Sequence, residues 1–314
     1  IPTINKFANQ GLSISQKYSI SIPLGKVKIT RKVNDLTIIV RSYTSTQIYK
    51  SKIMLDQNKS RIFEKQKIEY TLRTINSLII SCKNALNNFR DLKINLLITD
   101  DNSSKENLKL IENLLNSSGL ENKIINLKEN EYEEIIKKKD EKGADISKAM
   151  ISNMRNILKS VFLTRDEVSD LVYFVEDDYL HKENAISEML FTFEKIASQI
   201  NQDIFICPAD YPYLYSKDDA TKIYLGEKYH WRLVSESLVT FMTSRKIIKE
   251  NYSDLESMGI EWTDPWEKPL HEIYNSYPCL SPIPSLAIHC ANINSIFGIS
   301  PFVNLKKLWD NNEN

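Results

Sequence analysis

The chain has 314 residues, of which 42% are hydrophobic and 26% charged, a composition typical of folded globular proteins and unlike that of collagen-like or disordered chains. Its 41 Lys and Arg balance its 41 Asp and Glu, so the net charge is zero. This balance argues against a general electrostatic grip on nucleic acid. No apolar run approaches the ~20 residues that a transmembrane helix needs.

The cysteines point to a reducing compartment. Cys82, Cys207, Cys279 and Cys290 lie far apart and form no CxxC pair, a spacing that suggests neither a zinc ribbon nor a disulfide framework. We therefore expect a cytoplasmic protein, with peripheral attachment to a membrane left open. The chain begins at Ile1 rather than Met, which is compatible with a piece of a longer polypeptide.

Strands and helices alternate through the first two thirds of the sequence. Residues 1–34 alternate polar and apolar side chains, which predicts an N-terminal extension forming a hairpin or edge strand. Leu36–Tyr43 reads as a buried strand and Arg61–Asn88 as an amphipathic helix. The same unit recurs, with strands predicted at Lys93–Thr99, Lys123–Leu127 and Leu171–Val175, and helices at Lys105–Asn116, Ser147–Thr164 and Asn184–Ile200.

This alternation predicts an α/β fold with a mostly parallel sheet and helices on both faces, because parallel strands need crossover connections. Beyond residue 206 the pattern changes to loops and aromatic residues, with a hairpin-like stretch at Lys222–Val234. We expect one domain over residues 35–314. Its first half, 35–206, would bind a ligand at the carboxyl ends of the strands, and its second half, 207–314, would form the opposite wall.

The strongest chemical signal follows the strand at Leu171–Val175. Glu176, Asp177 and Asp178 stand in sequence at its carboxyl end, where clustered carboxylates are unfavourable unless a cation or proton offsets them. A Mg²⁺ or Mn²⁺ ion held by one or two carboxylates and by substrate phosphates supplies that compensation. The alternative is that these acids cap the next helix, which requires only one of them.

Two other predicted strands also end in polar residues. Asp100 and Asp101 follow the strand at Lys93–Thr99, where they could contact a ligand or cap the next helix. Arg41 and Tyr43 lie at the end of the first strand. The three strand ends would meet at one crevice.

These motifs, in this order, resemble those of GT-A glycosyltransferases near the family-2 type. Asp100-Asp101-Asn102-Ser103 stands where that group has its nucleotide-contacting turn, Met154-Arg155-Asn156 matches a helical Arg-Asn signature, and Glu176-Asp177-Asp178 matches the Asp-x-Asp-like metal motif. The resemblance implies a GT-A (Rossmann-like) fold and a nucleotide-diphosphate sugar donor. It assigns donor binding to Arg41, Tyr43, Asp100, Asp101, Arg155, Asn156 and Asp177, and assigns Mn²⁺ or Mg²⁺ to Glu176, Asp177 and Asp178.

The resemblance also guides the choice of residues in the second half. Asp264 precedes Pro265, which suggests a helix N-cap; inverting GT-A enzymes place their catalytic base at such a helix start, so Asp264 is the first candidate, ahead of Glu261 and Glu267. Late in the chain His289 follows an apolar run and is either a core residue or a further metal ligand.

Aromatic residues gather in the second half, where their flat faces suit stacking on sugar rings, although core packing explains some of them equally well. We assign acceptor contacts to His230, Trp231, Trp262 and Trp266.

Together these residues predict a metal-dependent glycosyltransferase that moves a sugar to a hydroxyl of a glycan or other acceptor, with inversion favoured. One alternative is a sugar-phosphate nucleotidyltransferase, which usually carries a Gly-rich loop after its first strand; Arg41–Thr46 contains no glycine. The other is a non-catalytic carbohydrate-binding protein. Such a protein would not need acids on a buried strand.

Overall fold

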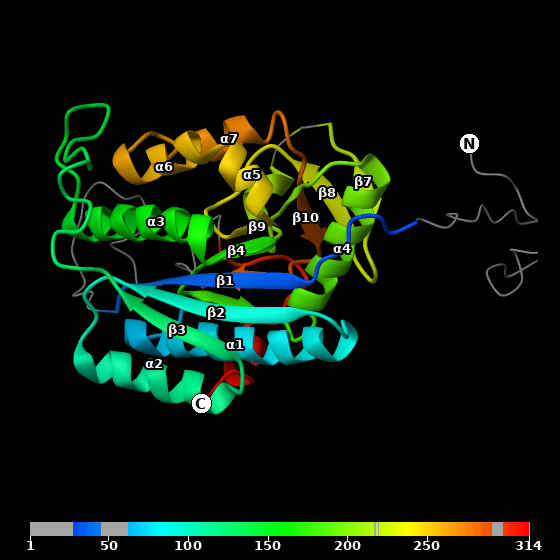
Figure 1. The fold of residues 1–314 in the computed structure, drawn as a ribbon, viewed down its shortest axis with the longest axis horizontal. Helices are drawn as coiled ribbons and strands as arrows, with labels where there is room; N and C mark the ends of the chain where they lie inside the picture. The colour runs from blue at the N-terminus through cyan, green and yellow to red at the C-terminus, as the bar shows by residue number, and fades with distance from the viewer. Residues whose placement is uncertain (1–27, 45–61, 217, 219, 291–297, 314) are drawn as a thin grey trace, which may run out of the picture.

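One nine-stranded sheet organises the protein, in the order β3-β2-β1-β4-β9-β6-β10-β8-β7 (Figure 1). The computed structural model describes residues 28–44, 62–216, 218, 220–290 and 298–313. The strands are β1 Asp35–Ser42, β2 Lys93–Asp100, β3 Glu121–Asn126, β4 Leu171–Glu176, β6 Phe205–Ile206, β7 Ile223–Leu225, β8 His230–Val234, β9 Phe241–Ser244 and β10 Cys279–Ile283. Only β9 and β8 run against the direction of the other seven.

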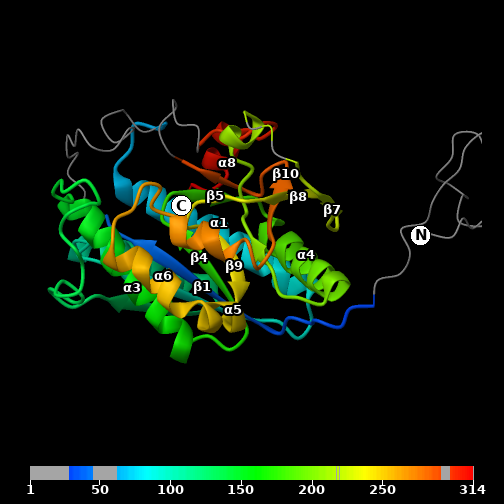
Figure 2. The same ribbon diagram turned by 90° about the horizontal axis from the view of Figure 1, so that it is seen from above.

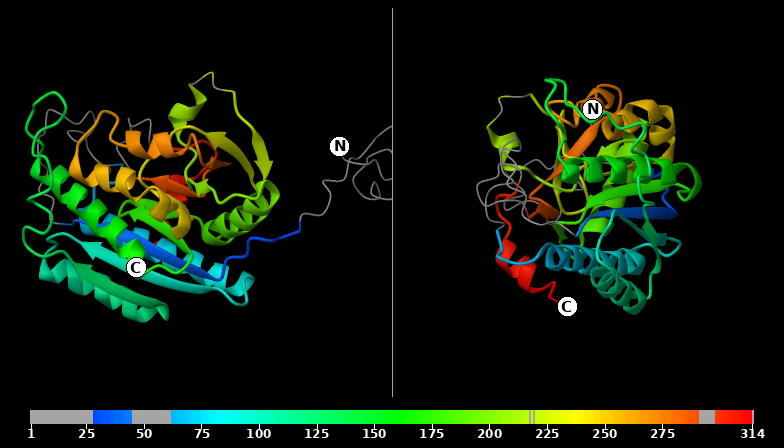
Figure 3. Two further views of the ribbon diagram at one scale, coloured as in Figure 1. Left: turned by 45° about the horizontal axis from the view of Figure 1, so that its top comes forward. Right: turned by 90° about the vertical axis from the view of Figure 1, so that its left-hand side faces the viewer.

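Helices cover both faces of this sheet (Figures 1 and 3). The helices are α1 Lys67–Asn88, α2 Lys105–Ser118, α3 Lys148–Asp166, α4 Ala185–Ile200, α5 Arg245–Glu250, α6 Tyr252–Ile260, α7 Lys268–Ile273 and α8 Leu305–Asp310. α1 packs with α2 and α4 on one face, and α3 packs with α5 and α6 on the other. The fold class predicted from the sequence, an α/β fold with a mostly parallel sheet between helices, is confirmed.

Local sequence explains why the predicted elements form. β1 is buried from its second residue to its last, as expected for a strand whose two faces are both covered by helices. α2 begins where the Ser104 hydroxyl accepts a hydrogen bond from the Asn107 backbone N–H, and it ends at Gly119 in the left-handed conformation, a common arrangement for helix ends. The predicted bounds of this helix therefore differ from the observed ones by two residues.

A small second sheet lies beside the carboxyl end of β4. It pairs β5 (Tyr179–His181) with β11 (Ala287–His289) in antiparallel register, with His289 opposite Tyr179. The backbone N–H of Cys290 also donates to the carbonyl of Asp178. Residues more than a hundred positions apart in sequence are thereby brought next to the predicted acid cluster. Figure 2 labels β5 and β4 in the view from above.

The predicted N-terminal hairpin falls mainly on residues 1–27, which lie outside the described residues. Residues 28–34 form no strand; Arg31 instead forms ion pairs with Asp170 and Asp203. No helix in the described part of the chain is long and apolar enough to cross a membrane.

Helix α6 approaches α3 closely at Gly259. A methyl group added there would lie 2.4 Å from the Leu158 Cγ and 3.0 Å from the Met154 carbonyl oxygen. We expect Gly259→Ala to destabilise the fold by about 1–3 kcal/mol, as overpacking of a dense interior does. Urea unfolding measures this change, and Ser253→Ala, at an exposed position of the same helix, should alter stability by less than ~0.5 kcal/mol. Equal midpoints for the two variants would contradict the close packing.

Candidate active site

Three parallel strands deliver their polar ends to the same edge of the sheet. β1 lies between β2 and β4, and its register pairs Ser42 with Asp100 and Arg41 with Glu176. The predicted meeting of these strand ends therefore occurs. In open α/β sheets this carboxyl edge is where ligands bind.

Asp177 is held firmly by groups from β1 and α1. Its Oδ1 lies 2.5 Å from the Lys67 Nζ. Its Oδ2 accepts hydrogen bonds from the Thr71 hydroxyl at 3.0 Å and from the Tyr43 backbone N–H at 3.2 Å. Both oxygens of this buried carboxylate are thus engaged by groups of the protein.

Asp178 lies between Lys67 and His289. Its Oδ2 is 3.3 Å from the Lys67 Nζ, and its Oδ1 is 3.4 Å from the His289 Nε2. The imidazole of His289 stacks on the ring of Tyr179, with centroids 4.7 Å apart and planes inclined by 4°. Burial opposes the charged imidazole, yet the carboxylates of Asp178 and Glu176 raise the pKa of His289 above its ordinary value. The structure thus brings His289 to the acid cluster.

Glu176 makes different contacts from its two neighbours. One carboxylate oxygen accepts a hydrogen bond from the Thr240 hydroxyl at 3.2 Å, and the other lies 3.8 Å from the guanidinium of Arg41. Arg41 also donates to the carbonyl of Val239. Burial lowers the pKa of Arg41, with Glu176 as the largest opposing influence. Arg41 therefore acts on the site through Glu176.

The charges of this cluster influence one acid of the second half of the chain, Glu267. Burial raises its pKa to about 7; the charge of Glu176 adds to the rise, while Arg41 and His289 oppose it. Glu267 is thus near enough to Glu176, Arg41 and His289 for their charges to influence its pKa. A carboxyl group that changes protonation near pH 7 suits general acid–base chemistry.

Asp264, the first candidate for the base, lies elsewhere. Its side chain is 73% exposed and pairs with Lys142, while that of Glu261 is 47% exposed and pairs with Lys137. The expected N-cap is wrong, because α7 begins only at Lys268 and the cap position is occupied by Glu267. Of the three acids predicted here, only Glu267 lies near the strand ends.

Contacts among protein groups order the turn after β2 and its surroundings. Asp100 accepts hydrogen bonds from the backbone N–H and the hydroxyl of Ser103, at 3.0 and 2.6 Å. Asp101 lies 3.2 Å from the guanidinium of Arg155, and Asn156 donates to the Ser42 carbonyl at 3.0 Å. Because Ser104 caps α2, the capping alternative for Asp100 and Asp101 is wrong.

The aromatic residues predicted to contact an acceptor are mostly structural. Trp231 is fully buried and its indole N–H donates to Glu188. Trp266 is also buried, stacks on Trp262 and donates to the Met258 carbonyl. The acceptor assignments of Trp231 and Trp266 are therefore wrong, because these side chains fill the core. Trp262 is half-buried and His230 is exposed at the start of β8.

Sequence reasoning missed two groups at or near this edge. Lys67 bridges Asp177 and Asp178 from α1. In the loop after β6, buried Asp210 pairs with Arg232 and accepts a hydrogen bond from the hydroxyl of Tyr215. These contacts join positions between 5 and 111 residues apart in sequence. For Asp210, the one signal in the sequence was an acid next to an aromatic-rich stretch; for Lys67 there was none.

The donor atoms around Asp178 fit a divalent ion only in part. Among the described residues, no three His, Cys, Asp or Glu side chains form a group that could hold a metal ion. Asp178 and His289 nevertheless converge, and the buried Nδ1 of His289 has no hydrogen-bond partner within the described part of the chain. One carboxylate and one imidazole, completed by substrate phosphate oxygens, are a set that Mn²⁺ or Mg²⁺ accepts.

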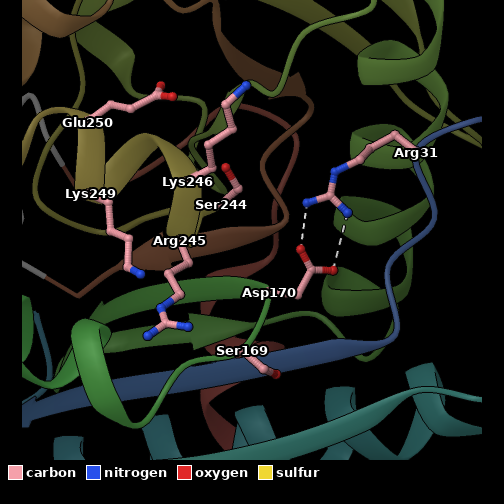
Figure 4. A pocket seen from close by; sticks show the side chains of 8 residues that line it. All are labelled: Arg31, Ser169, Asp170, Ser244, Arg245, Lys246, Lys249 and Glu250. Carbon is pink, nitrogen blue, oxygen red and sulfur yellow. Dashed lines mark hydrogen bonds and ion pairs between the residues drawn. The ribbon is translucent and has the colours of Figure 1, made fainter.

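A cavity of about 400 Å³ lies at the opposite end of β4 (Figure 4). Asp170 and Ser244, at the start of β4 and the end of β9, line it together with Arg31, Arg245 and Lys246. The Arg31 guanidinium is already paired with Asp170 in this cavity. None of the predicted site residues lines it.

No family profile and no curated protein matches the sequence. Among solved structures, the chain is similar to UTP-bound UGPase from Acinetobacter baumannii, at 10% identity over 89% of this chain and 93% of that one, with a TM-score of 0.42. It is also similar to the galactosyltransferase LgtC in complex with donor and acceptor sugar analogues, at 10% identity over 79% of this chain and 72% of that one, with a TM-score of 0.33. A third similar structure is apo mouse xyloside xylosyltransferase 1, at 10% identity over 84% of this chain and 80% of that one, with a TM-score of 0.35. At these identities and TM-scores, function has to be inferred from the side chains of the site.

The raised pKa of Glu267 predicts a pH-dependent effect on stability. A carboxyl whose pKa is higher in the folded state stabilises the fold at low pH, and this contribution is lost as pH rises from the ordinary value near 4.5 through 7. Gln stays neutral throughout. We therefore expect the melting temperature of Glu267→Gln, relative to wild type, to rise by roughly 2 °C or more between pH 5 and pH 8.

Differential scanning calorimetry at the two pH values measures this difference. Glu261→Gln, at a solvent-exposed carboxyl, is the control and should track wild type. If the difference in melting temperature between Glu267→Gln and wild type does not change with pH, the pKa of the Glu267 carboxyl group is not raised in the folded protein.

Proposed function

We propose that this protein is a glycosyltransferase that moves a sugar from a nucleoside-diphosphate sugar to an acceptor hydroxyl. The observation that carries the proposal is the convergence of Asp178 and His289 at the carboxyl edge of the sheet. The charges of Glu176, Arg41 and His289 also influence the carboxyl group of Glu267. Asp177 and Asp178 would face the diphosphate end of the donor, and Asp100, Asp101 and Arg155 its nucleoside end. Asp101 and Arg155 are already ordered by their mutual ion pair.

In this proposal Glu267 is the general base in place of Asp264. Its carboxylate takes the proton from the acceptor hydroxyl while that oxygen bonds to the anomeric carbon and the bond to the diphosphate oxygen breaks. Direct displacement of this kind inverts the anomeric configuration. A pKa near 7 matches the task, because the base is then partly ionised at neutral pH and is still a good proton acceptor.

The residues Asp178 and His289 would hold Mn²⁺ or Mg²⁺ together with phosphate oxygens of the donor. Bound there, the ion would supply electrostatic stabilisation of the charge that develops on the departing diphosphate. Asp177, whose two oxygens are occupied by Lys67, Thr71 and the Tyr43 backbone, would fix the position of the strand end that carries Asp178.

A sugar-phosphate nucleotidyltransferase is less consistent with these residues. Its nucleophile is a sugar phosphate, which is already ionised at neutral pH and needs no base. A hydroxyl does need one, and the pKa of Glu267, raised to about 7, suits that role. Incubation with UDP-sugars and GDP-sugars, compared with incubation with nucleoside triphosphates and sugar 1-phosphates, separates the two reactions by their products: nucleoside diphosphate in the first case and pyrophosphate in the second.

The base assignment predicts a specific loss of turnover. Glu267→Gln should lower kcat about a hundredfold or more, the usual contribution of general base catalysis, while nucleotide binding is retained. Asp264→Asn, at an exposed carboxyl outside the cluster, should keep near-normal kcat. Steady-state kinetics measures both, and NMR of the product's anomeric proton reports the configuration. A small effect of Glu267→Gln, or retained configuration, would eliminate Glu267 as the base.

The metal assignment predicts that Asp178→Asn abolishes the stabilisation of the protein by Mn²⁺ with UDP or GDP. For the wild type that stabilisation should reach about 2.7 kcal/mol at a nucleotide concentration 100 times the Kd. Asp166→Asn, an exposed acid at the end of α3, is the control and should respond like wild type. Thermal-shift titrations with Mn²⁺, and with EDTA in its place, make the comparison. Metal-dependent stabilisation that persists in Asp178→Asn would place the ion elsewhere.

A further inference from the structure

Lys67 is a buried cation at the centre of the site that the proposed mechanism does not yet use. It is the first residue of α1, and its side chain is 12% exposed. Its Nζ lies 2.5 Å from the Oδ1 of Asp177 and 3.3 Å from the Oδ2 of Asp178. One ammonium group therefore neutralises both carboxylates that follow β4.

This ammonium lies where it opposes a divalent ion. A metal bound to Asp178 would lie within a few ångströms of the Lys67 Nζ, because the same carboxylate contacts both. Two cations at that separation repel each other strongly in a partly buried site. In the absence of nucleotide, an incoming metal must therefore displace Lys67 from Asp178 or bind weakly beside it.

A diphosphate changes this competition. Phosphate oxygens offer the ammonium a new anionic partner, and a lysine, with its flexible stem and compact charge, binds phosphates as a point charge. Of the cations at this edge, Arg41 is tied to Glu176 and the Val239 carbonyl, and Arg155 to Asp101 and two backbone carbonyls. Among the described lysines and arginines of this edge, Lys67, whose contacts are with the two carboxylates themselves, is the best placed to move onto the diphosphate.

We propose that Lys67 couples metal binding to nucleotide binding. Resting on Asp177 and Asp178, it keeps the affinity for a divalent ion low. When a nucleoside diphosphate binds, its ammonium moves onto the phosphates and releases Asp178 for the metal. This inference rests on the proposed function, since it requires a diphosphate ligand. By thermodynamic linkage the effect is reciprocal, so metal and nucleotide each strengthen the binding of the other.

The test is to measure Mn²⁺ affinity by electron paramagnetic resonance, with and without saturating UDP or GDP, whichever binds the wild type. In Lys67→Met, which keeps side-chain length but removes the charge, Mn²⁺ alone should bind at least tenfold tighter than in wild type. The factor by which nucleotide strengthens Mn²⁺ binding should fall at least tenfold. Lys83→Met, an exposed lysine on the same helix, should match wild type in both measurements.

Melting temperatures confirm that each variant is folded, and Lys67→Gln, whose amide can still donate to Asp177, replaces Lys67→Met should the latter fail to fold. Equal Mn²⁺ affinity in wild type and the Lys67 variant, with nucleotide binding intact, overturns this proposal alone. Tighter Mn²⁺ binding with an unchanged nucleotide effect also overturns it, because Lys67 would then be only a counter-ion. Absence of nucleotide binding in wild type and variants alike overturns the proposed function and this inference together.

Discussion

Charge compensation at the end of β4 is the constraint on which the site depends. Glu176, Asp177 and Asp178 are delivered to a partly buried edge by a strand that is itself buried, where an uncompensated carboxylate would be strongly unfavourable. Basic side chains meet all three acids: Arg41 pairs with Glu176, Lys67 with both Asp177 and Asp178, and His289 with Asp178. These ion pairs connect the end of β4 to β1, to α1 and to the β5–β11 sheet.

The sequence was sufficient for the parts of the fold that local patterns control. The strands and helices predicted between residues 35 and 200 alternate, and each of them is present. Their bounds agree with the expected ones to within two residues, except that α1 begins at Lys67 and not at Arg61. Acids at strand ends could be found in the same way, because a strand's direction fixes where its last residue lies. The antiparallel β9, which is inserted between β4 and β6, depends on pairing over long sequence separations and has no local signature.

The site residues that follow directly from a strand could also be predicted, whereas those that depend on long-range contacts could not. Asp177 and Asp178 follow directly from β4, whereas the Lys67 that holds them is 110 and 111 positions earlier. Asp264 was predicted to be the catalytic base because it precedes a proline. However, α7 starts four residues later, at Lys268, and the side chain of Asp264 is exposed to solvent. Whether Glu267 or Asp264 faces the edge is decided by this shift of the helix start. Likewise, a tryptophan can either pack in the core or contact a ligand from a loop. Residue type alone therefore could not show that Trp231 and Trp266 lie in the core.

The charges at this edge also change the reason for expecting a metal. The acids alone do not require one: the four carboxyl groups of Glu176, Asp177, Asp178 and Glu267 are met by Arg41, Lys67 and His289, and Glu267 is partly protonated near pH 7. A nucleoside diphosphate would add at least two further negative charges to an edge that is close to balance. Under the proposed function, the need for a divalent cation would therefore arise only with the ligand. A site built in this way is compatible with metal binding that depends on nucleotide rather than preceding it.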